Sequence, residues 1–305
     1  MKTNMKLNFL VMITVIYTNL PQNVFAQSSQ KSLVDDTSLT DKIEKQADLN
    51  LKNNEWKIEN LRKSIANLKE TDQVQFSLPK AETKKLTAEE IYDKRSKGTL
   101  IVSNYYNCGN CSKMHSSTST GVVLNENGYC ITNYHVLQGI IEETKESRSN
   151  DSLAFVATND GNIYRISDIL SYSKAADIAI FKIDTRGEKF SPIPIGTSAK
   201  TGAKVHAITH PDSRYYFYSE GVVARNIQLD ALDSDKDRME ITADYAKGSS
   251  GGPILDSYGN LIGLVSTTQS IYYDQHEQKN LQMVIKSTIP VSAIKRLFKK
   301  EQVFN

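Results

Sequence analysis

The sequence has little excess charge of either sign, and it has no long apolar run in its interior. Its 37 Lys and Arg nearly balance 35 Asp and Glu, which leaves a formal net charge of +2 over 305 residues. The basic residues are scattered rather than clustered, so nothing here indicates nucleic acid as a partner. Beyond the N-terminal segment, no stretch approaches the about 18 apolar residues of a membrane span, so we expect no stable membrane insertion. A content of 39% hydrophobic and 24% charged residues is ordinary for a globular protein.

Cysteine is also scarce, and none directly follows the apolar segment near the N-terminus, which disfavours a lipid anchor. Residues 1–26 have the form of a secretory signal peptide. Lys2 and Lys6 give a positive start, residues 7–17 are mostly apolar, and the segment ending at Ala26 carries small residues where a signal peptidase cleaves. An uncleaved anchor is the alternative. Cleavage after Ala26 implies a periplasmic or secreted protein in an oxidising compartment.

Residues 27–85 form a polar, partly helical N-terminal extension and linker. Apolar residues with a 3-4-3 spacing predict a helix over Asn50–Lys69 with one apolar stripe, made of Ile58, Leu61, Ile65 and Leu68. A helix resting on the main domain is the favoured interpretation. A coiled-coil seam, through which the chain would oligomerise, is the alternative. Ser77–Lys85, which contains Pro79, is typical of a linker.

Residues 86–305 form the main domain, which the pattern predicts to be all-β. It opens with a capping box, Thr87 followed by Glu90, which predicts a short helix before the first strand. Short β-rich runs then alternate with turn signals such as Asn159-Asp160-Gly161, a spacing typical of a β-barrel or sandwich. Residues 290–297 predict a C-terminal helix that begins at Pro290.

Three short segments together carry catalytic chemistry. They are Ile131–Val136, Ala176–Ile180 and Gly248–Ile254, and they offer His135, Asp177 and Ser250 in that order. A serine hydroxyl is a poor nucleophile unless a base lies within hydrogen-bond reach and a third group orients that base. Glycine next to the serine lets backbone N–H groups point at a developing oxyanion.

On these motifs the chain resembles the trypsin-like serine peptidases, in particular the bacterial HtrA/Deg-like branch, from about Leu86 to Leu297. The gaps of 42 and 73 residues between the three catalytic residues fit two successive barrels. The resemblance implies two packed six-stranded β-barrels with the triad between them. It implies a serine endopeptidase that acts on peptides or unfolded proteins through an acyl-enzyme and needs no cofactor. The backbone N–H groups of Gly248 and Ser250 would form the oxyanion hole.

Two rival functions remain open. One is a catalytically silent pseudoprotease that binds peptides in the same cleft, and the other is a chaperone-like quality-control protein. Only eight residues follow Leu297. We therefore expect no peptide-binding PDZ module of the kind that many HtrA-like proteins carry.

The resemblance also implies a substrate-binding wall. Residues 261–266 match the strand that follows the serine motif in trypsin-like enzymes, so Ser266, Thr267 and Thr268 should line the cleft, with Ser266 close to Asp177. Asp244 lies six residues before Ser250, the offset that selects Arg and Lys in digestive enzymes. HtrA-like enzymes generally prefer small apolar residues, so a loop carboxylate is the favoured interpretation of Asp244.

The three cysteines leave two possibilities open. Cys108 and Cys111 predict a short disulfide in an exported chain, and with His115 they could instead bind zinc, although no fourth ligand is evident. Cys130 is expected to be a buried thiol. An acidic loop, Asp230 to Asp237, is expected to be a solvated hairpin tip rather than a calcium site, because it lacks the required Gly and Glu.

Overall fold

The computed structural model describes residues 33–53, 56, 58–108, 111–141 and 152–300, so the predicted signal peptide lies outside the described residues. The helices are α1 (Asp36–Asn53), α2 (Glu59–Ala66), α3 (Ala88–Arg95), α4 (Tyr134–Ile141) and α5 (Val291–Arg296). The strands are β1 (Thr99–Asn107), β2 (Met114–Ser116), β3 (Ser119–Val123), β4 (Tyr129–Thr132), β5 (Ser152–Ala157), β6 (Ile163–Ser173), β7 (Ile178–Ile183), β8 (Lys204–Thr209), β9 (Phe217–Ile227), β10 (Arg238–Ile241), β11 (Pro253–Leu255), β12 (Leu261–Asp274) and β13 (Lys279–Pro290).

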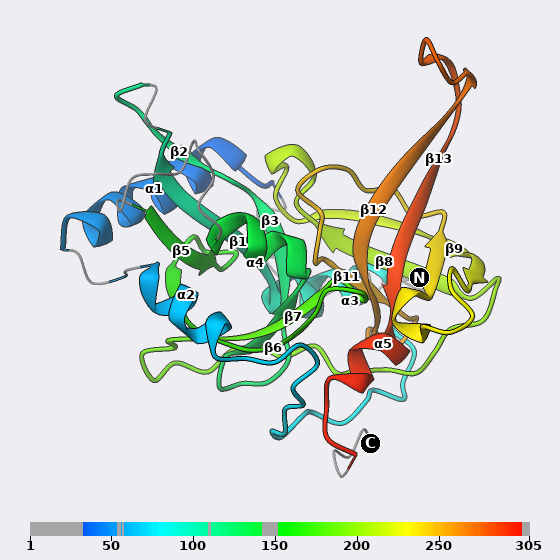
Figure 1. Ribbon diagram of the computed structural model, residues 1–305, viewed down its shortest axis with the longest axis horizontal. Helices are drawn as coiled ribbons and strands as arrows, with labels where there is room; N and C mark the ends of the chain where they lie inside the picture. The colour runs from blue at the N-terminus through cyan, green and yellow to red at the C-terminus, as the bar shows by residue number, and fades with distance from the viewer. Residues whose placement is uncertain (1–32, 54–55, 57, 109–110, 142–151, 301–305) are drawn as a thin grey trace, which may run out of the picture. The chain divides into compact units, whose positions relative to one another are not determined.

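The strands form two successive barrels (Figure 1). In the first, β1-β3-β4-β7-β6-β5 closes on itself because β5 pairs back with β1, and β2 extends β1 beyond the ring. The second is the closed barrel β10-β13-β12-β11-β8-β9. The prediction of an all-β fold with two six-stranded barrels is confirmed.

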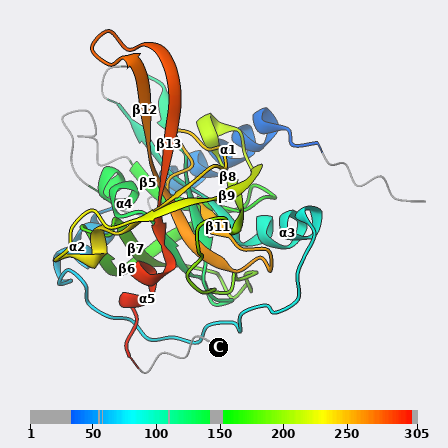
Figure 2. The ribbon, with the colours of Figure 1, turned by 90° about the vertical axis from the view of Figure 1, so that its right-hand side faces the viewer.

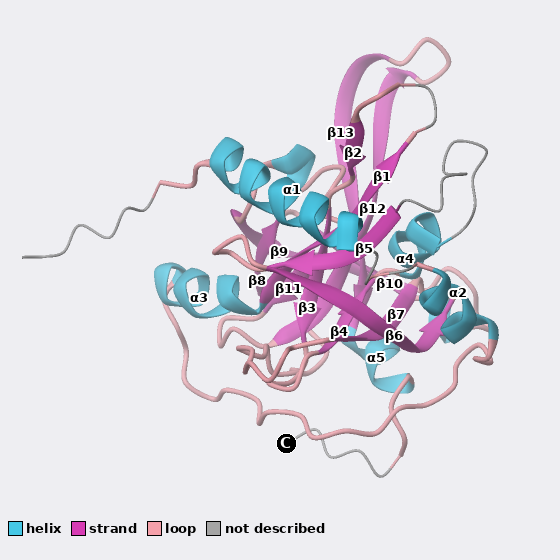
Figure 3. Ribbon diagram, turned by 90° about the vertical axis from the view of Figure 1, so that its left-hand side faces the viewer, coloured by secondary structure: helices cyan, strands magenta, loops and turns pink. Residues whose placement is uncertain are grey.

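The two barrels share one apolar core, which also reaches the N-terminal extension. A single buried cluster contains Ile43 and Ala47 of α1, Phe155 and Ile180 of the first barrel, and Leu264 of the second. Burial of side chains of this kind supplies most of the favourable free energy of folding. The barrels and α1 therefore fold as neighbours in one packed unit (Figure 3).

The N-terminal extension contains two helices, so the expected single helix over Asn50–Lys69 is wrong in its bounds. The turn around Ile58 separates α1 from α2. Ile58 and Leu61 are both buried in a cluster with Ile169 of β6, and Ser64 Oγ donates to the Ile169 carbonyl at 3.0 Å. The stripe therefore packs on the main domain, as the favoured interpretation predicted, and these two side chains are not available as a seam for a second chain.

The two helices expected at the start and at the end of the main domain, α3 and α5, are confirmed. Thr87 Oγ1 accepts a hydrogen bond from the Glu90 N–H at 3.2 Å, and Glu90 Oε2 accepts from the Thr87 N–H at 2.9 Å, so the capping box starts α3. Pro290 is the N-cap of α5. Among the described residues, no helix combines the length and the apolar character needed to cross a membrane.

The β12–β13 hairpin is the longest paired element of the second barrel. Its register runs from Gly263–Pro290 inside the barrel to Asp274–Lys279 at the far end (Figure 2). A bulge at Ser266 interrupts this register, but the barrel wall continues past it, because Ser287 and Lys286 of β13 still pair with β10. Ser266 Oγ, at the bulge, lies 3.1 Å from Asp177 Oδ2.

Candidate active site

His135 and Asp177 lie in direct contact because β4 and β7 are paired. Thr132 at the end of β4 is the register partner of Ala179 in β7, which places the residues that flank these strands side by side. His135 Nδ1 lies 2.9 Å from Asp177 Oδ2, and the His135 backbone N–H donates to Asp177 Oδ1 at 3.0 Å. One carboxylate therefore orients both the imidazole and the start of α4.

Asp177 is held in a left-handed conformation, with φ of 60°. Such a conformation is tolerated by Asp but costs free energy, and it persists only when neighbours fix it. Asn133 Nδ2 donates to the Asp177 carbonyl at 3.0 Å, and Ser266 Oγ donates to Asp177 Oδ2 at 3.1 Å. The carboxylate is thus fixed from the second barrel as well as from the first.

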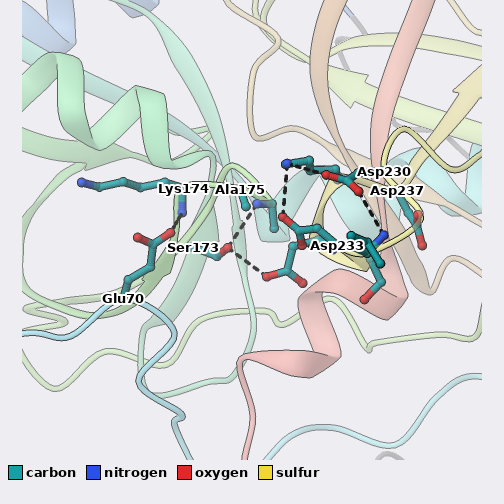
Figure 4. A network of polar contacts seen from close by, with 12 residues as sticks. Glu70, Ser173, Lys174, Ala175, Asp230, Asp233 and Asp237 are labelled. Atoms are coloured by element: carbon teal, nitrogen blue, oxygen red, sulfur yellow. Dashed lines mark hydrogen bonds and ion pairs between the residues drawn. The ribbon is translucent and has the colours of Figure 1, made fainter.

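The acidic loop supports the turn that carries Asp177 (Figure 4). Ser173 Oγ donates to Asp235 Oδ2 at 3.2 Å, and Arg238 Nη2 donates to the Ala175 carbonyl at 3.2 Å. Burial lowers the pKa of Arg238, and the nearby carboxylate of Asp177 opposes this shift. The loop is exposed at its tip, as expected, with Leu232 98% exposed, but Asp235 and Arg238 also contact the turn before Asp177. These contacts join segments about 60 residues apart in the chain, so no local sequence pattern could predict them.

Ser250 lies on the loop between β10 and β11, which approaches the first barrel. Its carbonyl accepts a hydrogen bond from the Thr120 N–H of β3 at 2.9 Å. Gly251 has φ of 80°, and a Cβ there would collide with Thr132 at the end of β4. Glycine is thus required for the close approach that brings the Ser250 loop to the base of the His135 segment.

Within the described residues, no hydrogen bond joins the His135 ring to Ser250 Oγ. The structure thus brings together His135 and Asp177, and it places Ser250 on a loop of the second barrel whose backbone is hydrogen-bonded to Thr120 of the first barrel. Contacts between a nucleophile and its base are often long without substrate and tighten in the complex.

The peptide between Lys247 and Gly248 has a fixed orientation. The Lys247 carbonyl accepts a hydrogen bond from the Asp212 N–H at 2.6 Å, and Gly248 has φ of 94°. The described chain contains no cis peptide bond, and in a trans peptide the N–H points opposite to the carbonyl. The Gly248 N–H is therefore directed away from Asp212. No local sequence pattern indicates this contact, because Asp212 makes it through its backbone N–H.

Asp244 makes an ion pair that the sequence did not reveal. Its Oδ1 lies 2.7 Å from Nζ of Lys286, whose side chain is 12% exposed. Lys286 lies in β13 and is the register partner of Thr268 in β12. The adjacent Tyr245 places its hydroxyl 3.0 Å from the Thr267 carbonyl. The residues expected to line the substrate-binding wall are thus close to a lysine as well as to an aspartate.

Cys108, Cys111 and His115 lie close together, but no disulfide bond links the two cysteines. Sγ of Cys108 lies 3.5 Å from Sγ of Cys111, well beyond the about 2.05 Å of a disulfide bond. His115 Nε2 lies 3.1 Å from Sγ of Cys111. The disulfide stays a prediction. Cys130 is buried as expected, and burial raises the pKa of its thiol.

Comparison with known proteins connects this geometry to a family. Residues 119–264, which include all three catalytic candidates, match the family described as "Trypsin-like peptidase domain". The chain is 33% identical over 153 residues to Protease Do-like 1, chloroplastic, of Arabidopsis thaliana, covering 48% of this chain and 32% of that protein. It is 28% identical over 154 residues to serine endoprotease DegS of Haemophilus influenzae, covering 49% of this chain and 41% of that protein.

Solved structures agree on the fold. The HtrA-type protease AlgW with a decapeptide superposes with a TM-score of 0.53 at 18% identity, covering 70% of this chain and 66% of that chain. The chain spans less than half the length of these two curated relatives. Residues 119–264 thus match the trypsin-like peptidase domain, and the proteins similar to this chain include serine endoproteases of the Deg type and, in fold, an HtrA-type protease.

Proposed function

We propose that this chain is an exported serine endopeptidase that hydrolyses peptide bonds through Ser250, His135 and Asp177. The observation that carries the proposal is the contact of 2.9 Å between His135 Nδ1 and Asp177 Oδ2. The glycine-bounded loop of Ser250 supports it, because this loop is hydrogen-bonded to β3 of the barrel that carries the pair. With Nδ1 occupied by the carboxylate, the other ring nitrogen, Nε2, is the one that takes up the proton of the nucleophile.

The reaction then follows from the roles of these groups. Ser250 Oγ attacks the substrate carbonyl and gives its proton to His135, and Asp177 stabilises the resulting imidazolium. His135 returns the proton to the leaving amine, which leaves an acyl-enzyme on Ser250. A water molecule, deprotonated by His135, hydrolyses the ester and frees the enzyme.

The developing oxyanion would be bound by the backbone N–H groups of Gly248 and Ser250. The hydrogen bond from Asp212 to the Lys247 carbonyl supports this role, because it fixes the peptide whose N–H belongs to Gly248. A pre-oriented donor stabilises charge without reorganising during the reaction, and removal of one donor typically costs about 10²–10³ in rate.

The substrate would bind along Ser266–Thr268 as an added strand. Among the strands described, β12 pairs with β11 only as far as Leu264, whereas β13 continues along its other side. One edge of Ser266–Thr268 therefore has no strand partner within the described barrel. Extended peptides bind such edges through main-chain hydrogen bonds, which suits a peptide or an unfolded protein.

Labelling with a fluorophosphonate tests the proposal directly. Wild type should be labelled at Ser250, and Ser250→Ala should lose the label while it remains folded. Ser257→Ala, on the turn that follows β11, is the matched control and should be labelled like wild type. A folded wild type that resists labelling would favour a pseudoprotease or a chaperone-like protein that only binds peptides.

A further inference from the structure

The end of the β1–β2 hairpin gathers two cysteines and a histidine. Cys108 follows the last residue of β1, Cys111 lies in the connection, and His115 is the central residue of β2. The three ligand atoms all lie within 4.8 Å of one another. Among the described residues, no other group of three or more His, Cys, Asp or Glu side chains has its ligand atoms close enough to hold a metal ion.

We propose that Cys108, Cys111 and His115 bind one zinc ion, with the fourth position open to water or to an exogenous ligand. Zinc bonds of about 2.3 Å to sulfur and about 2.0–2.1 Å to nitrogen place tetrahedral ligand atoms roughly 3.5–3.8 Å apart. The two sulfurs are 3.5 Å apart, and Cys111 Sγ is 3.1 Å from His115 Nε2. These two separations lie within about 0.5 Å of those in a zinc site, and all three ligand atoms lie within 4.8 Å of one another.

The ligand set selects zinc over harder cations. Two thiolates and an imidazole suit zinc and copper(I), whereas calcium and magnesium require oxygen ligands. Zinc binds the deprotonated sulfurs, so each binding event displaces the two thiol protons into solvent. Cys111 is exposed, and Cys108 and His115 are half-buried, which gives the ion a path of entry.

The histidine is held in place before any ion arrives. His115 is the register partner of Tyr106, and their ring centroids are 5.8 Å apart. The next residue, Ser116, donates through Oγ to Glu44 Oε1 of α1 at 2.8 Å. Tyr105 in β1 likewise donates to Asp48 Oδ1 at 2.8 Å. Helix α1 thus fixes both strands of the hairpin that carries the cluster.

A disulfide between Cys108 and Cys111 would use the same sulfurs, but it gives no account of His115. In a three-residue spacing the two cysteines alone suffice for a disulfide, so the histidine would have no reason to turn Nε2 towards Cys111. The zinc site uses all three groups. Cys108, Cys111 and His115 are not among the proposed catalytic or substrate-binding residues. The zinc proposal can therefore be tested independently of the proposed peptidase activity.

Metal titration of the full chain tests the site. Reduced wild type, stripped with a chelator and exchanged into chelator-free buffer, should take up one zinc ion in native mass spectra. Cobalt(II) added in place of zinc should give thiolate charge-transfer absorption and the visible bands of a tetrahedral ion. Cys108→Ser, Cys111→Ser and His115→Gln should each weaken zinc binding about tenfold or more, because each removes one of three ligands.

His276→Gln is the matched control, because His276 is exposed on the β12–β13 turn and far along the chain from the cluster. It should bind zinc as wild type does. Three results would overturn the proposal: no zinc uptake by reduced wild type, unchanged affinity in His115→Gln, or a Cys108–Cys111 disulfide in protein recovered from its exported form. Stoichiometric copper(I) binding with no zinc uptake would also contradict the choice of metal.

Discussion

Asp244 Oδ1 lies 2.7 Å from Lys286 Nζ, and this ion pair argues against basic specificity, in agreement with the favoured interpretation of Asp244 as a loop carboxylate. Asp244 has the offset from Ser250 that selects basic residues in digestive enzymes, but its carboxylate is 79% exposed and is already paired with a lysine that is 12% exposed. The positive charge of a substrate Arg or Lys would have to compete with Lys286. We therefore expect wild type to show no strong preference for basic residues at the cleavage site.

Lys286→Ala should release Asp244 and increase cleavage after Arg or Lys by about tenfold relative to cleavage after Ala, because one charge no longer repels the substrate. The ratio of kcat/KM for peptides that differ only at that residue measures the effect. Lys279→Ala, at the far end of the same hairpin, should leave the ratio unchanged. A wild type that already cleaves selectively after Arg or Lys would contradict this interpretation.

Arg238 is expected to position Asp177 through the turn that precedes it. Its guanidinium donates to the carbonyls of Ala175 at 3.2 Å and Asp235 at 2.9 Å, so it joins the acidic loop to the catalytic turn. Arg238→Ala should lower kcat roughly tenfold or more with a smaller change in KM, because a small displacement of the orienting carboxylate is costly.

Arg225→Ala is the control for loss of an arginine from the same barrel, since Arg225 lies on β9, is 62% exposed and pairs with Glu240 of β10 rather than with the turn of Asp177. Steady-state kinetics and thermal unfolding of both variants separate positioning from stability. If Arg238→Ala lowers the melting temperature but leaves kcat unchanged, the arginine is structural only.

His210 should make the stability of the fold depend on pH. It is fully buried beneath the Ser250 loop, its Nδ1 accepts a hydrogen bond from the Tyr216 N–H at 3.0 Å, and burial lowers its pKa to about 3. Between about pH 6.5 and pH 3, His210 is therefore protonated in the unfolded chain but stays neutral in the folded protein. The contribution of the neutral histidine is complete above about pH 6.5 and is lost as the pH falls towards 3, by about 1.4 kcal/mol per unit.

His210→Asn keeps an acceptor for the Tyr216 N–H but cannot titrate, so its free energy of unfolding should fall less steeply between about pH 6.5 and 4. Urea unfolding at a series of pH values measures both slopes. His276→Asn, which changes an exposed histidine, should follow wild type. Equal slopes for wild type and His210→Asn would remove His210 from the pH dependence.

The parts of the site that the sequence predicted lie next to strands. His135 follows β4, Asp177 precedes β7, and Ser250 sits in a glycine-bounded loop, so local pattern was sufficient to identify them. The pairing of β4 with β7 then brings His135 and Asp177 together. The double barrel itself follows from repeated short strands and turns.

The parts that the sequence did not predict depend on contacts between distant segments. Lys286 meets Asp244 because β10 and β13 are paired, and Arg238 reaches Ala175 across 63 residues. Helix α1 buries only Ile43 and Ala47, so its apolar pattern was too sparse to reveal it. These features are set by packing and register, which no local spacing encodes.

The most direct test of the account is the turnover of Ser250→Ala measured beside wild type on casein or a peptide library. We predict that the variant keeps the melting temperature of wild type and loses turnover by about 10⁴-fold or more, because the members of a triad act as a unit. Equal cleavage by the two proteins would contradict the assignment of Ser250 as the nucleophile and, with it, the proposed function.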